Sequence, residues 1–228
     1  MVILSFDVSN YGVINIGRFQ LWITETLINT WIIMAVLIIF AVVTRIALKN
    51  FNAVPKGFQN VIEMIVEAFD NFLRNTAGEK MMFLGHWFFT VFIFLIVSNT
   101  IGLFGLRPPT ADWNVTFTFA IVTFFLIQAM GIKFRRGKYV KSIFLEPNPV
   151  FGILNVVGEL ARPVSLSFRL FGNILAGMIL MSLLYLVPVV RFGFPAALHF
   201  YFDLFAGVLQ AFIFCVLSLS FIRVAATE

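Results

Sequence analysis

Arg169 is the residue whose type and place point most directly to chemistry. It lies well inside a long apolar segment. A charged side chain at the centre of a membrane costs on the order of 3 kcal/mol on insertion scales, so such residues mark an ion path, a substrate site or a partner charge. A guanidinium does not lose its proton in proteins, so Arg169 cannot be neutralised. We expect it to meet a partner charge or water.

Two further residues share the helical face of Arg169. Arg162 precedes it by seven residues and Asn173 follows it by four, spacings that place all three side chains on nearly one side of a helix. Asn173 fits either an ion path or an interhelical hydrogen bond without transport. Glu159 and Arg162 are secondary candidates for the ion path, and they also fit an ion pair near the membrane interface.

A second polar face is predicted in the last apolar segment. His199, Asp203 and Gln210 stand at i, i+4 and i+11 of a helix, and each is an ionisable or hydrogen-bonding group at membrane depth. Asp203 and His199 also fit a structural pair, and Gln210 fits an interhelical hydrogen bond. Small residues near both faces allow close helix packing: Gly172, Ala176, Gly177, Ala206 and Gly207. The pattern predicts two facing polar stripes.

No motif of soluble catalysis occurs in the sequence. GxxxxGK[ST], HExxH, paired CxxC and GxSxG are all absent, so nucleotide hydrolysis, zinc chemistry and serine hydrolysis have no support. The single cysteine, Cys215, has no partner for an intrachain disulfide and lies in an apolar run. We expect no cofactor and no metal, and we expect the chemistry to be transport.

Composition sets the class of protein. Of 228 residues, 61% are hydrophobic and 12% are charged, which is typical of a membrane protein and not of a soluble domain. The net charge of +5 comes mainly from basic residues beside apolar segments, which favours anchoring to a membrane surface over nucleic-acid binding. We expect no nucleic-acid partner and one membrane domain over residues 1–228.

The elements that hold these residues are predicted to be all-α. The segment 55–74 alternates apolar and polar residues at helical spacing, which predicts an amphipathic helix on the membrane surface. Five other segments are long and apolar enough to span a bilayer: 27–48, 83–106, 115–132, 150–190 and 195–224. The last two exceed the length of a perpendicular span and flank the prolines at 188 and 195, so we expect a long tilted hairpin.

Lysine and arginine gather on alternate links between these segments. The links after 27–48 and after 115–132 are rich in basic residues, and the opposite links hold few. By the positive-inside rule this predicts the N-terminus outside and the C-terminus in the cytoplasm. We expect a bacterial inner (plasma) membrane rather than an organelle or thylakoid membrane.

Three stretches resemble subunit a of F-type ATP synthases. The stretch Arg162-Pro-Val-Ser-Leu-Ser-Phe-Arg169-Leu-Phe-Gly-Asn173-Ile-Leu-Ala-Gly177 looks like the signature of that family. Leu209-Gln210-Ala-Phe-Ile-Phe214 looks like its second signature, and residues 110–116 resemble the stretch that starts the preceding membrane helix. The resemblance covers nearly the whole chain.

This resemblance implies a fixed stator beside a rotating ring of carboxylate-bearing hairpins, the c-ring, with two offset half-channels for protons or Na⁺. Arg169 matches the essential arginine that faces the ring, Asn173 the signature asparagine, and Gln210 the polar partner on the last helix. Asp203 stands where the family commonly has a histidine or carboxylate. Met178 replaces an acidic residue or histidine that many members carry, and His199, one turn from Asp203, is a candidate to compensate.

The implied partners are the c-ring, peripheral stalk subunit b, the other F-type ATP synthase subunits and the lipid bilayer. Nucleotide chemistry then belongs to partner subunits, and this chain is not itself the enzyme. The alternatives are a self-contained secondary ion transporter, although the sequence lacks two halves with corresponding broken helices, and a structural membrane scaffold.

Overall fold

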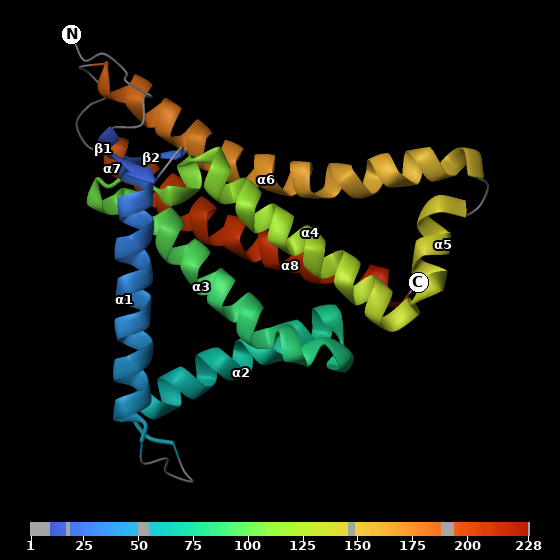
Figure 1. The fold of residues 1–228 in the computed structure, drawn as a ribbon. Coiled ribbons are helices and arrows are strands. Elements are labelled where there is room, and N and C mark those ends of the chain that lie inside the picture. Colours follow the sequence, from blue (N-terminus) through green and yellow to red (C-terminus); the bar gives the residue numbers. More distant parts are fainter. Residues whose placement is uncertain (1–9, 17–18, 50–54, 146–148, 188–193, 228) are drawn as a thin grey trace.

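The computed structural model describes residues 10–16, 19–49, 55–145, 149–187 and 194–227 (Figure 1). Five helical segments within these ranges are long and apolar enough to cross a membrane, as predicted. They are Glu25–Ala47, Glu79–Phe104, Trp113–Arg135, Gly152–Tyr185 and Ala197–Thr227.

Helix α1 (Glu25–Ala47) stands apart from the other spans over most of its length (Figure 1). Only Thr26, Asn29 and Ile33 on it are buried. The Thr26 hydroxyl donates to Asp112 Oδ2 at 3.1 Å, and Asn29 Nδ2 donates to the Arg107 carbonyl at 2.9 Å. Because polar bonds fix its first turns and its remaining surface is apolar and exposed, the rest of α1 suits contact with lipid.

A β-hairpin precedes α1, and the sequence did not predict it. Strand β1 (Asn10–Ile16) pairs antiparallel with β2 (Phe19–Thr24), with Ile14 opposite Leu21. Thr24 ends β2 and caps α1, because its hydroxyl accepts from the Leu27 amide.

Helix α2 (Phe58–Ala77) is the predicted amphipathic helix, and it crosses the direction of α1 (Figure 1). Phe69, Leu73 and Ala77 are buried against the bundle, whereas Glu67 and Arg74 on the opposite side are exposed. Gly78, with φ 88°, ends the helix in a conformation that glycine adopts without strain. The sharp division of apolar and polar faces fits a helix lying along a membrane surface.

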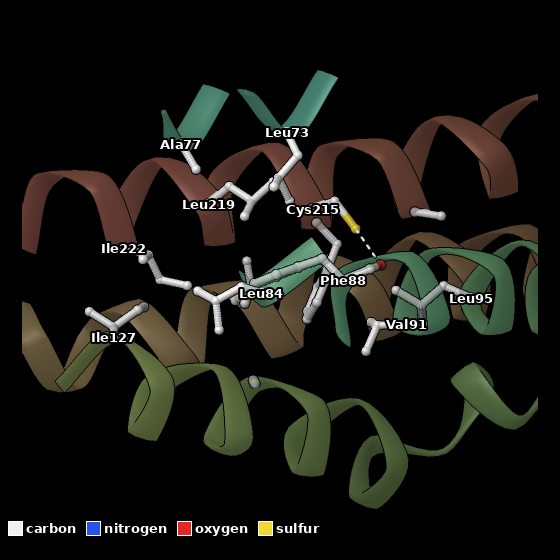
Figure 2. Close-up of a cluster of buried hydrophobic side chains, with 14 of the residues drawn as sticks. Leu73, Ala77, Leu84, Phe88, Val91, Leu95, Ile127, Cys215, Leu219 and Ile222 are labelled. Atoms are coloured by element: carbon white, nitrogen blue, oxygen red, sulfur yellow. Dashed lines mark hydrogen bonds between the residues drawn. The ribbon is translucent and has the colours of Figure 1, made fainter. Parts of the chain in front are cut away.

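The core lies where α2, α3 and α8 meet (Figure 2). The span predicted over 83–106 consists of a 3₁₀ turn η1 (Glu79–Leu84), helix α3 (Gly85–Thr100) and a second 3₁₀ turn η2 (Ile101–Phe104). Phe88 on α3 is fully buried, and Cys215 on α8 (Gly207–Thr227) directs its thiol to the Phe88 carbonyl at 4.0 Å. Cys215 is therefore a packing residue.

Helix α4 (Trp113–Arg135) packs against both α6 and α8. A short 3₁₀ turn η3 (Pro109–Ala111) leads into it, and Asp112 caps it by accepting from the Asn114 amide, as its residue type predicts. The chain then turns at Arg136, with φ 52°, into helix α5 (Gly137–Leu145), which the sequence suggested only as a basic link.

The last two spans form the predicted hairpin, and both run obliquely to α1 (Figure 1). Helix α6 (Pro149–Tyr185) contains Pro163, which removes one ladder hydrogen bond and explains a bend in so long a helix. The last span, which runs back alongside α6, is not one continuous α-helix. Helix α7 (Phe194–His199) is followed by a π-helical segment η4 (Phe200–Ala206) and then by α8. Residues 188–193, where the turn was expected, lie outside the described residues.

Candidate functional site

Arg169 points out of the bundle because its neighbours on α6 point in. Leu166, Ser167 and Leu170 are buried, and the Ser167 hydroxyl lies 3.3 Å from that of Thr116 on α4. These inward contacts leave position 169 on the opposite side of the helix, where the guanidinium is exposed. Within the described ranges no ion pair or hydrogen bond joins Arg169 to another side chain. A permanent cation is therefore presented on a membrane-facing helix.

Small residues surround Arg169 on the exposed face of α6. Ala161, Ser165 and Ala176 on α6 are exposed, and nothing would touch a Cβ placed on Gly172. Ser165 and Ala161 precede Arg169 by four and eight residues, and Gly172 and Ala176 follow it by three and seven, so they form one stripe of small side chains around the cation. Such a stripe allows another helix to approach closely.

Helix α6 runs antiparallel to the last span, and two contacts between them, at different levels along α6, bracket Arg169 and Gln210. At one level the Arg162 guanidinium lies 5.1 Å from the centre of the Phe221 ring. At the other, a Cβ on Gly177 would lie 3.3 Å from Phe202 Cβ in η4. Arg169 and Gln210 lie between these levels on their helices.

Asn173 and Gln210 do not meet directly. Asn173 is half-buried one turn beyond Arg169, whereas Gln210 is buried, with 6% of its surface exposed. Among the described side chains, neither bonds to the other or to Arg169. The two stripes predicted from the sequence therefore lie on packed helices, but no hydrogen bond links them.

The π-helical segment changes the predicted second stripe. An α-helix would place Asp203 and Gln210 on one face, but the wider turns of η4 rotate the chain between them. Asn99 on α3 holds this junction: its Nδ2 donates to the Gly207 carbonyl at 2.8 Å, and its Oδ1 accepts from the Thr110 hydroxyl at 2.7 Å. A Cβ on Gly207 would lie 2.8 Å from Asn99 Cβ, so the contact requires glycine.

Glu159 and Arg162 form the ion pair that their spacing allows, with 2.7 Å between Oε1 and the Arg162 guanidinium. Gln128 Nε2 donates to Glu159 Oε2 at 3.1 Å, and the Tyr139 hydroxyl donates to Gln128 Oε1 at 3.1 Å. Burial, together with the nearby charge of Glu159, raises the pKa of the Tyr139 phenol above its ordinary value. The network thus keeps a neutral donor on α5 bonded to α4 and α6.

A polar cavity of about 520 Å³ lies beside this network, lined among others by Arg135, Ser142 and Glu159. A second cavity, of about 210 Å³, shares Gly158 and Arg162 with it and reaches Arg169. The two cavities therefore lie next to each other between the Pro149 end of α6 and the exposed cation.

At the other end of α6, Asp203 and His199 do lie together. His199 Nδ1 is 2.6 Å from Asp203 Oδ2, and the Tyr185 hydroxyl is 3.2 Å from His199 Nε2. Sequence reasoning found His199 and Asp203 but missed Tyr185. The sequence spacing could have revealed Tyr185, because it follows Met178 by seven residues and therefore lies on the same face of α6 as Met178.

Known proteins resemble this chain over most of its length. A family model described as the ATP synthase A chain matches residues 27–223. "ATP synthase subunit a, sodium ion specific" of Propionigenium modestum is 36% identical over 226 residues, which cover 91% of this chain and 75% of the relative.

Two further relatives named ATP synthase subunit a are similarly close. That of Desulfosudis oleivorans is 35% identical and covers 86% of this chain and 85% of its own length. That of Moorella thermoacetica is 35% identical and covers 88% and 89%, respectively. These matches confirm the resemblance first seen in residues 162–177, and the chain belongs to the ATP synthase A chain family.

Proposed function

We propose that this chain is the ion-translocating stator subunit of the membrane sector of an ATP synthase and that Arg169 is its central charge. The observation that carries the role of Arg169 is its exposure on α6 with no ion partner in the described part of the chain. Because a lipid-facing cation is costly, a carboxylate from another subunit must face it in the membrane. The stripe of small residues around Arg169 fits a rotating ring of helices that carries such carboxylates, the c-ring.

The mechanism is electrostatic. An ion that enters through one half-channel neutralises a ring carboxylate, which can then pass into lipid. When that carboxylate returns, Arg169 favours its ionised form, so it releases its ion on the other side. Each charge that crosses is worth about 2.3 kcal/mol per 100 mV, so several ions must pass for each ATP made.

Two sets of polar residues fit the two half-channels. The cavities that share Arg162 lead from the Pro149 end of α6 to Arg169, and Glu159 lines the larger one. Asp203 and His199 lie at the Tyr185 end. Asn173 and Gln210 lie between these ends and fit polar groups that keep water and ions near Arg169.

The partners follow from this role. The c-ring lies against the exposed face of α6, while peripheral stalk subunit b and the remaining ATP synthase subunits complete the machine. Nucleotide chemistry takes place in those partners, so this chain is a non-catalytic subunit.

The orientation follows from the basic links. Bacterial relatives support a bacterial plasma membrane, and the basic turn between α4 and α5 fits the cytoplasmic side. Reporters fused after Lys138 and at the C-terminus should read cytoplasmic, and one near Pro109 should read external. A cytoplasmic reading at Pro109 would reverse the assignment.

Substitution of Arg169 tests the function. Arg169→Ala should leave the complex assembled, because alanine favours helix and removes a costly charge, and it should abolish ATP synthesis in sealed vesicles under an imposed ion gradient. Arg169→Lys should rescue poorly, because an ammonium lacks the guanidinium fork and can lose its proton. Ser165→Ala, one turn away on the same exposed face, is the matched control and should retain synthesis. Near-normal synthesis by an assembled Arg169→Ala complex would contradict the mechanism.

A further inference from the structure

Three side chains form a continuous hydrogen-bonded line at the Tyr185 end of α6. Tyr185 is 47% exposed, and its hydroxyl lies 3.2 Å from His199 Nε2. The other ring nitrogen, Nδ1, lies 2.6 Å from Asp203 Oδ2. Exposure falls along this line, from the tyrosine through a half-buried imidazole to a carboxylate that is 18% exposed. The order of groups therefore leads from the surface inward.

The inner end of the line is held in place by backbone. A Cβ on Gly102 of η2 would lie 3.0 Å from Asp203 Cγ, so the carboxyl group packs directly against the glycine. The wider turns of η4 carry Asp203, and His199 is the last residue of α7 just before them. The carboxylate is thus fixed by η2 on one side and by the imidazole on the other.

The face of α6 that meets this line lacks another proton carrier. Met178, Ser182 and Tyr185 follow one another at i, i+4 and i+7. A thioether does not relay protons, and the Ser182 hydroxyl donates to the Met178 carbonyl at 2.8 Å. Tyr185 is the group on this face that reaches His199.

We propose that Tyr185 and His199 form a proton relay that loads and unloads Asp203, so that this end of the chain passes protons and not Na⁺. This relay rests on the function proposed above. It identifies the transported ion as the proton, and Tyr185 and His199 as two of the side chains that carry it. Hydronium gives a proton to the Tyr185 oxygen as the phenol passes its own proton to His199 Nε2, and Nδ1–H passes its proton to the Asp203 carboxylate. One proton enters, one water molecule is left and one carboxyl group forms. The first tautomer returns when Nδ1 takes up a proton from water and Nε2 releases its proton to water.

The surroundings suit proton transfer and not sodium binding. Few titratable side chains lie near this line. The described residues of α7, η2, η4, α3 and the last two turns of α6 provide His199, Tyr185, Asp203 and the exposed Tyr201. His86 lies at the far end of α3. Sodium sites replace the ion's hydration shell with several oxygens. Here one carboxylate oxygen already bonds an imidazole and the single phenol oxygen bonds the same ring. An imidazole between two oxygens carries protons only.

Removal of one hydroxyl tests the relay in the assembled ATP synthase. Tyr185→Phe keeps the ring beside His199 and should lower the rate of ATP-driven proton uptake by sealed vesicles several-fold, both without Na⁺ and with Na⁺ present. Tyr201→Phe is the matched control and should leave the rate unchanged, because Tyr201 is similarly exposed and its ring packs against Phe202 and Phe205. Equal rates for both variants, or pumping of Na⁺ by the wild-type complex, would overturn the relay.

Chemical rescue separates proton transfer from a structural role. His199→Ala should lower proton uptake by at least about tenfold, since positioned acid–base groups contribute about 10²–10⁴-fold. Added imidazole should restore part of the rate to this variant and should not change the wild-type rate. Restoration by imidazole in an assembled complex supports transfer, whereas an unrestored loss assigns His199 a structural role and overturns the proposal. If Arg169→Ala abolishes synthesis while the relay variants behave normally, the relay fails and the proposed function stands.

Discussion

The two ends of α6, which lie at opposite sides of the molecule in Figure 1, both carry polar side chains but differ in their contacts. At the Pro149 end, Gln128, Tyr139, Glu159 and Arg162 join three helices around a cavity of about 520 Å³. At the Tyr185 end, Tyr185, His199 and Asp203 form a single hydrogen-bonded line. The first end joins helices beside a cavity, and we propose that the second passes protons through side chains.

The largest effect should come from the inner member of the line. Asp203→Asn keeps the size of the side chain and can still bond to His199, but it removes the group that accepts the proton. We expect ATP-driven proton uptake to fall by at least about tenfold in an assembled complex. Glu67→Gln, which removes an exposed carboxylate on α2, should leave the rate unchanged. Normal uptake by Asp203→Asn would remove the difference between the two ends.

The Pro149 end should respond to a packing change. A Cβ on Gly131 would lie 2.5 Å from Tyr139 Cζ, so Gly131→Ala must displace the ring and should cost about 1–3 kcal/mol. The thermal midpoint of the complex in mild detergent would measure the loss. Gly137→Ala adds a methyl group where nothing lies within 4 Å and should be neutral or slightly stabilising. Equal midpoints for the two variants would show that α5 does not depend on this contact.

A smaller effect should follow from the ion pair. Glu159→Gln leaves the Arg162 cation beside the cavity without its carboxylate, but the pair is partly exposed to solvent. We expect a loss of about 1 kcal/mol or less and a fall in proton uptake of less than about threefold. A loss of uptake as large as that of Asp203→Asn would show that the Glu159 carboxylate itself carries the ion rather than only lining the cavity.

The smallest effect should be visible only in alkali. The pKa of Tyr139 is raised by folding, so the folded chain holds the phenolic proton more tightly than the unfolded chain. Its contribution is fully present below the ordinary value near 10 and is lost as pH rises through that value toward the raised one. The thermal midpoint of the wild type should therefore fall more steeply than that of Tyr139→Phe between about pH 9 and pH 11. Parallel curves would place the Tyr139 hydroxyl outside the network.

The sequence by itself determined the class of protein, its five spans and its candidate residues. Span length and apolarity follow from the thickness of a bilayer, and a charge such as Arg169 is conspicuous there because it is costly. Helical spacing was also enough to pair Glu159 with Arg162 and His199 with Asp203, because such partners lie within about one turn of the same helix.

Only the tertiary structure decided how these residues are presented. Arg169 faces outward because Leu166 and Ser167 pack inward, a choice that depends on which neighbouring helices exist. The segment η4 breaks the expected register of Asp203 and Gln210, since Asn99, more than one hundred residues earlier, bonds the Gly207 carbonyl. Tyr185 reaches His199 across a chain reversal. Contacts between residues distant in sequence decide such details, and the periodicity of a single helix carries no information about them.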